Sequence, residues 1–448
     1  MKKLFGTDGI RGFANEDPMT SETALALGRA LAVFFRNGGH HKILIGKDTR
    51  RSCYMLETAL ASGLCSMGAD AIFIGPMPTP GIAFLTQAMR ADAGVVISAS
   101  HNRFDDNGLK VFDRLGYKLP DDAELKLEAL MTSGELMKNR PTGDRIGRAH
   151  RVDDAAGRYI EFVKSTFPKG RTLDGIRLVV DCAHGAAYKV APTVFEELGA
   201  KTAVIGASPN GTNINDGCGA THPEVVAAEV KRVGARIGIA LDGDADRVVF
   251  SDEKGNTVDG DAILAICAED LLKKKRLKDG VVVATVMSNK ALENYIAACG
   301  GRLERAAVGD RYVVEKMREG DYGLGGESSG HLVFFDHATT GDGLIAALQV
   351  LAIMTETGKT LSELVSRYRP LPQVLTSVKV PSRKDLAQFP DVQKMVRDFE
   401  GKLGADGRIL VRYSGTEPVV RIMIEGREDA VIRKMAGDLS TCIQKSLG

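Results

Sequence analysis

Short apolar runs alternate with amphipathic stretches along most of the chain, which is the pattern of buried strands joined by helices. The first part of the chain predicts three strands and two helices in alternation: strands Lys42–Ile45, Ala71–Ile74 and Ala93–Ile97, and helices Cys53–Met67 and Gly81–Met89. Strands and helices that alternate in this way form right-handed crossovers and mostly parallel sheets.

The same order of elements returns twice further along the chain. The second copy predicts strands Leu178–Val180, Thr202–Ile205 and Arg236–Leu241, with helices Lys189–Leu198 and Pro223–Val233. The third copy predicts strands Val281–Thr285, Arg302–Ala307 and Tyr322–Leu324, with helices Ala291–Ala298 and Arg311–Met317. The pattern therefore predicts three copies of one α/β unit.

The pattern changes after Pro370–Pro372, which is typical of a linker. The tail predicts strands Thr376–Val380, Ile409–Tyr413 and Val419–Glu425, with helices Val392–Leu403 and Ala430–Leu447. We therefore expect an α/β fold with three similar domains, each with a mixed or parallel sheet, plus a smaller C-terminal α+β domain, all around a central cleft. The expected domain boundaries are 1–155, 156–255, 256–368 and 373–448.

Composition narrows the possible functions. The 448 residues are too many for one hydrophobic core. A net charge of +1, from 59 basic and 58 acidic side chains, argues against a surface for nucleic acid or anionic membranes. The N-terminal residues do not resemble a signal peptide, and no run of apolar residues is long enough to span a membrane. The seven cysteines include no C-x-x-C pair, so we expect reduced thiols and a cytoplasmic location.

Each predicted unit ends its last strand in a different polar loop. The loops are Ser98–Asn102 in the first copy, Asp242–Arg247 in the second and Gly325–His331 in the third. Ligands of parallel sheets bind beyond the carboxyl ends of the strands. Three equivalent units would therefore present three different loops to one site. Duplication without a shared site is the alternative, and the distinct chemistry of the loops weighs against it.

Asp242, Asp244 and Asp246 are separated by single small residues. Carboxylates this close repel one another unless a cation lies among them, and oxygen ligands favour Mg²⁺. An EF-hand calcium loop is the main competitor, because Glu253 falls at its twelfth position. Arg247 stands where that loop needs glycine, however, and the flanking segments are strand-like. A solvated acidic turn is the remaining alternative.

Glu327, Ser329 and His331 lie among glycines, which let the backbone approach a ligand closely. A carboxylate and a hydroxyl in such a loop are suited to binding sugar hydroxyls. A buried structural imidazole is the alternative interpretation of His331.

Two further groups of residues are candidates for binding phosphate. Arg11, in a glycine-rich segment, and Lys110 have the charge to hold a phosphate or to act in proton transfer. The small turn Ser414–Thr416 lies between Arg412 and Arg421, which is the composition of a phosphate cradle. Solvated surface cations and a plain surface hairpin are the alternatives.

Four motifs, in this order, resemble the α-D-phosphohexomutase superfamily over essentially the whole chain: Ser98–Asn102, Asp242–Arg247, Gly326–His331 and Arg412–Pro418. Within the superfamily, the chain is most similar to the bacterial phosphoglucosamine mutase group. This narrower resemblance depends on the segments Phe5–Gly12, Asn213–Asn215, Cys218–His222 and Ala338–Gly343.

The resemblance implies a role for each candidate residue. Ser100 is expected to become a phosphoserine, with His101 as a further catalytic residue beside it. Mg²⁺ is expected to bind to Ser100 and to the three acidic-loop residues, Asp242, Asp244 and Asp246. The other implied roles are Arg247 beside the phosphate, Lys110 and Arg11 at the transfer, Glu327, Ser329 and His331 at the sugar, and Arg412, Ser414, Gly415, Thr416 and Arg421 on the phosphate that is not transferred.

The implied reaction interconverts glucosamine 6-phosphate and glucosamine 1-phosphate through a 1,6-bisphosphate, and it feeds UDP-N-acetylglucosamine and cell-wall synthesis. A hexosamine or glucose 1,6-bisphosphate is the expected activator. The expected partners are sugar phosphates and a second copy of the chain, without nucleic acid or membrane. The alternatives are a phosphomannomutase/phosphoglucomutase, a Mg²⁺-dependent sugar phosphatase, and a sugar-phosphate sensor that never becomes phosphorylated.

Overall fold

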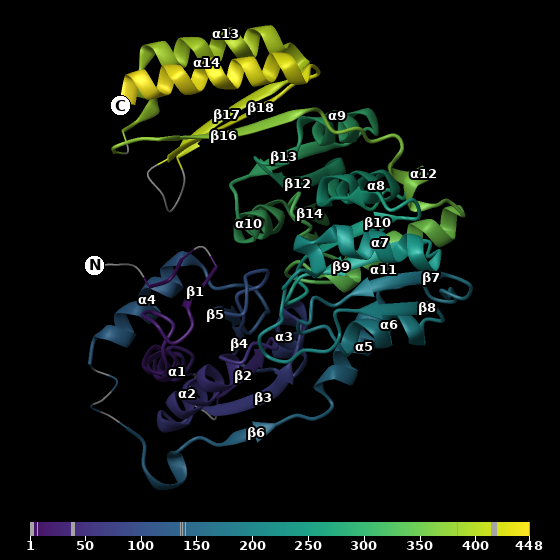
Figure 1. The fold of residues 1–448 in the computed structure, drawn as a ribbon. Coiled ribbons are helices and arrows are strands. Elements are labelled where there is room, and N and C mark those ends of the chain that lie inside the picture. The colour runs from purple at the N-terminus through teal and green to yellow at the C-terminus, as the bar shows by residue number, and fades with distance from the viewer. Residues whose placement is uncertain are drawn as a thin grey trace. The chain divides into compact units, whose positions relative to one another are not determined.

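The computed structural model describes residues 4–6, 8–36, 41–134, 136, 138, 140–382, 384–413 and 419–447 (Figure 1). Contacts between residues divide the chain into two compact units. The larger unit comprises Met1–Met287 and Leu303–Ser366, and the smaller comprises Ser288–Arg302 and Arg367–Gly448. The proposed catalytic loops all belong to the larger unit.

The first sheet of the larger unit has six strands in the order β1-β5-β4-β2-β3-β6. Strands β2, β3, β4 and β6 run parallel, whereas β5 pairs antiparallel with both β1 and β4. The strand bounds are β1 Ile10–Phe13, β2 Lys42–Lys47, β3 Asp70–Pro76, β4 Ala93–Ile97, β5 Asp106–Asp113 and β6 Ala149–Arg151. The helices of this region are α1 Ser21–Phe34, α2 Cys53–Ser66, α3 Thr79–Ala88, α4 Asp121–Thr132 and α5 Ala155–Ser165.

The second sheet has the order β11-β10-β9-β7-β8. Its parallel strands β7, β8 and β9 are followed by β10, which pairs antiparallel with β9. The bounds are β7 Arg177–Asp181, β8 Lys201–Ile205, β9 Ile237–Leu241, β10 Val248–Asp252, β11 Thr257–Val258, α6 Val190–Glu197 and α7 Pro223–Val233.

The third sheet has the order β13-β12-β14-β15, and β14 again pairs with a parallel strand on one side and an antiparallel strand on the other. The strands are β12 Val281–Thr285, β13 Arg302–Ala306, β14 Leu324–Gly326 and β15 Leu332–Phe334. The helices are α8 Gly260–Lys273, α10 Asp310–Gly320, α11 Gly343–Thr357 and α12 Leu361–Val365. In all three sheets, one of the three predicted site loops connects a parallel strand to the antiparallel strand beside it.

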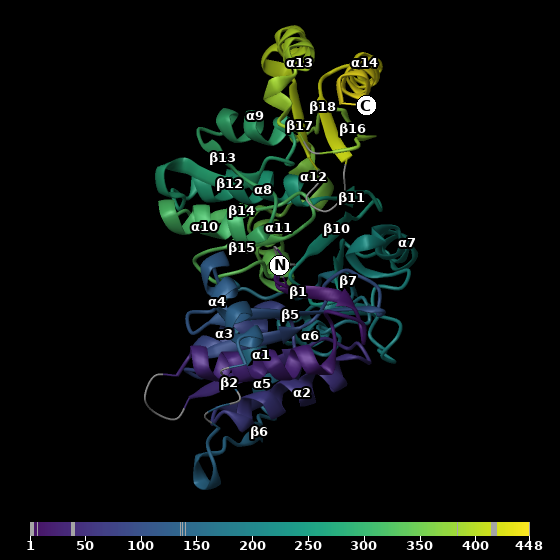
Figure 2. The same cartoon turned by 90° about the vertical axis from the view of Figure 1, so that its left-hand side faces the viewer.

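The smaller unit contains a three-stranded antiparallel sheet in the order β16-β18-β17. Helices α13 and α14 contact each other and lie over one face of this sheet, as Figures 1 and 2 show. The bounds are β16 Gln373–Lys379, β17 Arg408–Tyr413, β18 Val419–Glu425, α9 Lys290–Ala298, α13 Pro390–Leu403 and α14 Asp429–Leu447. The buried Glu425 joins α9 to the sheet, because it accepts a hydrogen bond from the Lys290 N–H and pairs with Arg408.

The expected fold class is confirmed, with three mixed α/β sheets followed by a smaller α+β region. One strand prediction was wrong in detail, and strand β5 was not predicted. The buried Lys110 lies in β5, where carboxylates are its partners. The strand expected at Tyr322–Leu324 lies at Leu324–Gly326, where Gly325 lets Met317 and the Val283 carbonyl approach closely.

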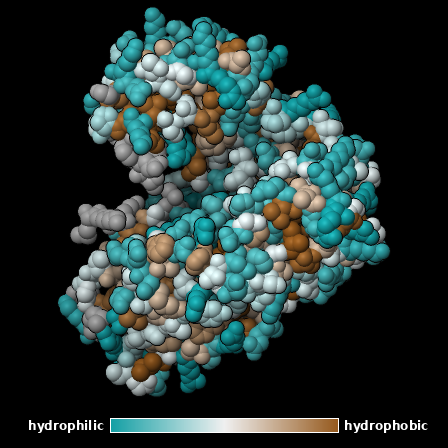
Figure 3. Space-filling model, viewed as in Figure 1, coloured by the Kyte–Doolittle hydropathy of each residue, from teal (hydrophilic) through white to brown (hydrophobic). Residues whose placement is uncertain are grey.

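Apolar side chains are gathered into cores inside each sheet region, and the face of the molecule in Figure 3 is mostly hydrophilic. Within the described ranges, every helix is too short or too polar to cross a membrane.

Helices α1 and α2 cross at two glycines, and this close approach can be tested. A Cβ atom on Gly63 would lie 2.3 Å from the Leu25 carbonyl oxygen and 3.1 Å from the Gly28 Cα. We expect Gly63→Ala to lower the free energy of unfolding by about 1–3 kcal/mol, the usual cost of overpacking. The control is Gly157→Ala on the exposed side of α5, where a Cβ would meet no atom of the described residues within 4 Å. The control should gain up to ~1 kcal/mol, because alanine favours the helix. Equal denaturation midpoints for the two variants would contradict this account of the crossing.

Candidate active site

Ser100 lies in a tight turn directly after β4, and it faces the acidic loop that follows β9. Its side chain is 1% exposed, and its Oγ donates a hydrogen bond to Asp242 Oδ2 over 2.6 Å. Its φ is +52°, a left-handed conformation that costs free energy for a residue with a side chain. The Ser100 N–H donates to Ser98 Oγ over 2.9 Å. The structure therefore brings together the predicted nucleophile and a predicted metal ligand that lie 142 residues apart in the sequence.

The three acidic-loop side chains, Asp242, Asp244 and Asp246, are all buried, and their carboxylate oxygens lie within 4.8 Å of one another. Burial raises the pKa of Asp242 well above its usual range, and the charges of the other two carboxylates raise it further. Strands β9 and β10 flank the loop, so the EF-hand alternative is excluded. Glu253, its supposed twelfth ligand, instead hydrogen-bonds to Ser362.

Lys110 projects from β5 into the acidic loop. Its Nζ lies 3.0 Å from Asp244, 3.8 Å from Asp246 and 3.3 Å from Asp8. Burial alone would lower the pKa of Lys110, but these carboxylates outweigh it and raise the pKa. The same contact lowers the pKa of Asp244 against the effect of burial, and Thr79 Oγ1 adds a hydrogen bond of 2.7 Å to this carboxylate.

Three further candidate residues surround the Ser100 turn. Arg247 Nη1 lies 3.0 Å from His101 Nδ1, so this nitrogen accepts and the imidazole is neutral. Burial lowers the pKa of His101 to about 4, and the charges of Arg247 and Arg11 act in the same direction. Arg11 Nη1 donates to the Ala99 carbonyl over 3.2 Å, and its guanidinium also pairs with Asp8. Two cations therefore lie close to the turn that carries the serine hydroxyl.

The loop after β14 lies against the acidic loop, because the Val248 N–H at the start of β10 donates to the Gly330 carbonyl over 3.0 Å. Glu327 is largely buried, and its Oε1 accepts a hydrogen bond from the Gly309 N–H. Ser329 is exposed, and its Oγ lies 3.4 Å from Glu327 Oε2. The predicted sugar-binding residues therefore combine a held carboxylate with an accessible hydroxyl.

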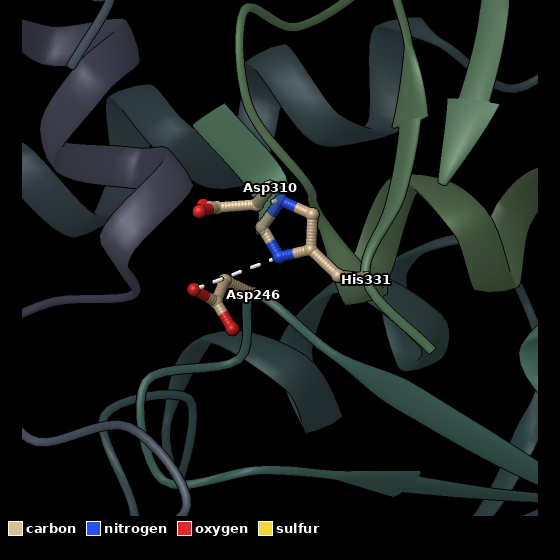
Figure 4. A group of neighbouring side chains, drawn as sticks. All are labelled: Asp246, Asp310 and His331. Carbon is tan, nitrogen blue, oxygen red and sulfur yellow. Dashed lines mark ion pairs between the residues drawn. The ribbon is translucent and has the colours of Figure 1, made fainter. Parts of the chain in front are cut away.

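His331 lies between two carboxylates, as Figure 4 shows. Its Nδ1 is 3.7 Å from Asp246 Oδ2, and its Nε2 is 3.6 Å from Asp310 Oδ2. The Gly341 N–H donates to Nε2 over 3.0 Å, so the neutral ring carries its proton on Nδ1, facing Asp246. Burial opposes protonation, but the nearby carboxylates raise the pKa of His331. The His331 ring is buried and contacts the acidic loop, and its role at the sugar stays a prediction.

Sequence reasoning missed a charged chain that joins the first and third sheets. Lys118 Nζ lies 2.5 Å from both Asp8 and Asp310, and all three side chains are mostly buried. Burial raises the pKa of both carboxyl groups, but nearby cations outweigh it. The charges of Lys110 and Lys118 hold the pKa of Asp8 well below its usual range, and Lys118 lowers the pKa of Asp310 to about 2. The one local signal is that Asp310 begins α10, a place where carboxylates are favoured.

The remaining candidates belong to the smaller unit. Arg412 on β17 lies opposite Arg421 on β18 in the register of the sheet. Burial lowers the pKa of Arg412, and the like charge of Arg421 lowers it further. Two guanidinium groups kept side by side in this way are suited to an anion. The other members of this predicted cradle, Ser414, Gly415 and Thr416, lie outside the described residues.

The acidic loop fits a divalent cation on the evidence of its own atoms. Asp244 Oδ1 and Asp246 Oδ1 are buried and accept no hydrogen bond from any of the described residues. Unsatisfied buried carboxylate oxygens are costly, and a hard cation is the ligand they suit. The second cluster, of Asp246, Asp310 and His331, has its charge partly balanced already by Lys118, which favours an ion-pair network there.

Four family models, each described as a domain of phosphoglucomutase/phosphomannomutase, match consecutive parts of the chain. The α/β/α domains I, II and III match residues 2–138, 157–255 and 259–371, and the C-terminal domain matches residues 375–441.

Individual proteins give the same result. A curated phosphoglucosamine mutase from Geotalea daltonii is 58% identical, covering 100% of this chain and 99% of its own. A solved phosphoglucomutase/phosphomannomutase family protein from Burkholderia thailandensis superposes with a TM-score of 0.83 at 25% identity, covering 99% and 97% of the two chains. The N-acetylphosphoglucosamine mutase of Aspergillus fumigatus, solved with GlcNAc-6P and magnesium, shares the fold with a TM-score of 0.67 at 18% identity, covering 99% and 96%.

The fold, and a buried serine aimed at three carboxylates, define the class of phosphohexomutases, isomerases that move a phosphoryl group between two positions of a hexose. More particularly, the chain belongs to the phosphoglucomutase/phosphomannomutase family. The predicted superfamily is thereby confirmed.

The repulsion within the acidic loop leads to a prediction about Asp242. Because its pKa is raised, its ionised form destabilises the folded protein at neutral pH. We expect Asp242→Asn to melt at a higher temperature than wild type without metal, and to lose most of the stabilisation by Mg²⁺. Wild type should gain about 2.7 kcal/mol at a Mg²⁺ concentration 100 times the dissociation constant.

Melting curves with and without Mg²⁺ test this prediction, with Asp122→Asn on the exposed face of α4 as the control. A Mg²⁺ response in Asp242→Asn as large as in wild type would show that the cation does not bind at this loop.

Proposed function

We propose that the protein is a phosphoglucosamine mutase, which interconverts glucosamine 6-phosphate and glucosamine 1-phosphate. The observation that carries this proposal is the 2.6 Å hydrogen bond from Ser100 Oγ to Asp242, inside a buried group of three carboxylates. The name of the 58% identical relative supports glucosamine as the sugar.

In the proposed reaction, phosphorylated Ser100 gives its phosphoryl group to the free hydroxyl of glucosamine 6-phosphate. The bond from phosphorus to Ser100 Oγ breaks, a bond to the sugar oxygen forms, and the hydroxyl proton leaves to a basic group or water. The product is the 1,6-bisphosphate, which turns over in the site. Ser100 Oγ then takes the phosphoryl group from position 6, and glucosamine 1-phosphate is released.

The basic residues are proposed to neutralise charge during the transfer, since phosphoryl transfer depends mainly on positioning and electrostatics. Arg247 and Lys110 lie against the acidic loop, and Arg11 is hydrogen-bonded to the turn of Ser100. Their cationic charges persist at neutral pH, because neighbouring carboxylates raise the pKa of each against the effect of burial. His101 is proposed to assist as a neutral imidazole beside the serine.

Asp242, Asp244 and Asp246 are proposed to hold Mg²⁺ together with Ser100. The bound ion would supply positive charge next to the oxygens of the phosphoryl group. Glu327 and Ser329 are proposed to bind the sugar hydroxyls, with His331 close by. Arg412, Ser414, Gly415, Thr416 and Arg421 are proposed to hold whichever phosphate is not being transferred.

Priming, location, oligomeric state and domain boundaries are also part of the proposed function. A hexosamine or glucose 1,6-bisphosphate would prime Ser100, and the protein would be cytoplasmic and homodimeric. The domains would be residues 1–155, 156–255, 256–368 and 373–448. The matched family segments begin and end near these boundaries, which supports them.

The function is tested by offering the 6-phosphates of glucosamine, glucose and mannose side by side, with a trace of glucose 1,6-bisphosphate. We expect the glucosamine compound to have the highest kcat/KM and to yield the 1-phosphate. Ser100→Ala and Ser100→Gly should both be inactive but folded, and the glycine variant also removes the strain of the positive φ. Preference for mannose or glucose would favour the other mutase, and release of inorganic phosphate would indicate a phosphatase. Full activity in either variant would rule out Ser100 as the residue that carries the phosphoryl group.

The distal phosphate site gives a separate prediction. Arg421→Ala should raise KM for the sugar phosphate by about 10- to 100-fold, since a hydrogen bond between charged groups is worth about 1.5–3 kcal/mol. The effect on kcat should be smaller. Arg433→Ala is the control, because this exposed arginine on α14 pairs with Asp429. Steady-state kinetics with an unaltered KM would exclude Arg421 from phosphate binding.

A further inference from the structure

The segment Asn213–Asn215 contributes to the resemblance to the phosphoglucosamine mutase group, but the proposed reaction assigns it no role. It lies in the loop between β8 and α7, in the second sheet region. Asn213 closes this loop on itself, because its Oδ1 accepts from the Asn210 N–H and its Nδ2 donates to the Ser208 carbonyl. These two hydrogen bonds fix the backbone of the loop directly before Ile214 and Asn215.

Asn215 reaches out of its own loop to the turn that carries Ser100. Its Nδ2 donates to the Ser100 carbonyl over 2.9 Å and to the Asn102 carbonyl over 2.8 Å. The side chain is 5% exposed, and its own N–H is bonded to the Ala183 carbonyl over 3.0 Å. Hydrogen bonds therefore hold both the backbone and the side chain of Asn215. The side-chain amide donates to the backbone carbonyls on either side of His101.

Arg50 binds the same two carbonyls from the first sheet region. Its Nη2 lies 3.2 Å from the Ser100 oxygen and 2.5 Å from the Asn102 oxygen, and Nη1 pairs with Asp48. Arg50 is fully buried. Arg50 and Asn215, from different sheet regions, thus hydrogen-bond to the same short turn. These bonds stabilise the turn against the strain of the Ser100 backbone, whose φ is +52°.

The acidic loop touches the same turn. A Cβ atom on Gly243 would lie 2.6 Å from the Ser100 oxygen and 2.8 Å from both Asn215 Nδ2 and Ile214 Cδ1. Only glycine permits this approach, so the Ser100 turn, the Asn215 loop and the acidic loop pack directly against one another. A shift of Asn215 would therefore move Ser100 relative to Asp242.

We propose that Asn215 is a positioning residue for phosphoryl transfer: with Arg50 it holds the carbonyls of Ser100 and Asn102, and so keeps Ser100 Oγ aimed at Asp242. This inference rests on the proposed function. Asn215 acts through Ser100, not on the sugar. Its loss should therefore lower the rate of transfer and leave sugar-phosphate binding almost unchanged.

Two variants remove the amide donor in different ways. Asn215→Gly tolerates the φ of +56° at this position, and Asn215→Asp keeps the size of the side chain. The matched control is Asn210→Gly, an exposed asparagine of the same loop whose Oδ1 accepts from the Thr212 N–H. The measurements are kcat and KM with glucosamine 6-phosphate, and hydrogen exchange at the backbone amides of residues 99–103.

We expect both Asn215 variants to lose about 100-fold in kcat, the scale of a misplacement of about 1 Å. KM should stay within about twofold, amide exchange at residues 99–103 should accelerate, and the control should match wild type. A structural role alone would lower the melting temperature without a change confined to these amides. Wild-type kcat and wild-type exchange in the variants would overturn the proposal. If wild type itself lacks mutase activity, the proposed function fails, and the exchange measurement still decides whether Asn215 holds the turn.

Discussion

The mutual repulsion of three buried carboxylates is the constraint on which the rest of the site depends. Asp242, Asp244 and Asp246 are held within a few ångströms of one another, out of water, and two of their oxygens accept no hydrogen bond from the part of the chain that the structure describes. Such an arrangement persists only if its surroundings are rigid. Lys110, on β5, balances part of the negative charge of the three carboxylates. The negative charge that remains makes the loop suited to a metal ion.

Backbone hydrogen bonds from two other sheet regions fix the acidic loop in place. The Thr79 N–H donates to the Asp244 carbonyl over 2.9 Å, and the Gly343 N–H donates to the Ala245 carbonyl over 3.0 Å. The chain from Asp8 through Lys118 to Asp310 adds charged contacts between the first and third sheets. The serine, the carboxylates and the loop after β14 therefore form one interdependent group.

Much of the fold and of the site was predictable from the sequence, because periodicity marks strands and helices, and parallel strands present their carboxyl ends at one edge. Ser100 and the aspartates follow such strands. Helix α11 was not predicted, because it is buried on most sides and so lacks an amphipathic period. The ion pairs of Lys118 and the contact of Asn215 with the Ser100 turn were not predicted for another reason: the partners are distant in the sequence, and no local pattern indicates such contacts.

The central claim is that Ser100 Oγ is the atom that carries the phosphoryl group. The most direct measurement is to incubate the protein and Mg²⁺ with a hexose 1,6-bisphosphate labelled in its phosphoryl groups, and then to map the label by peptide mass spectrometry. The account predicts one labelled residue, Ser100, and release of the label when unlabelled glucosamine 6-phosphate is added. Label at another residue, or active enzyme that never takes up label, would contradict it.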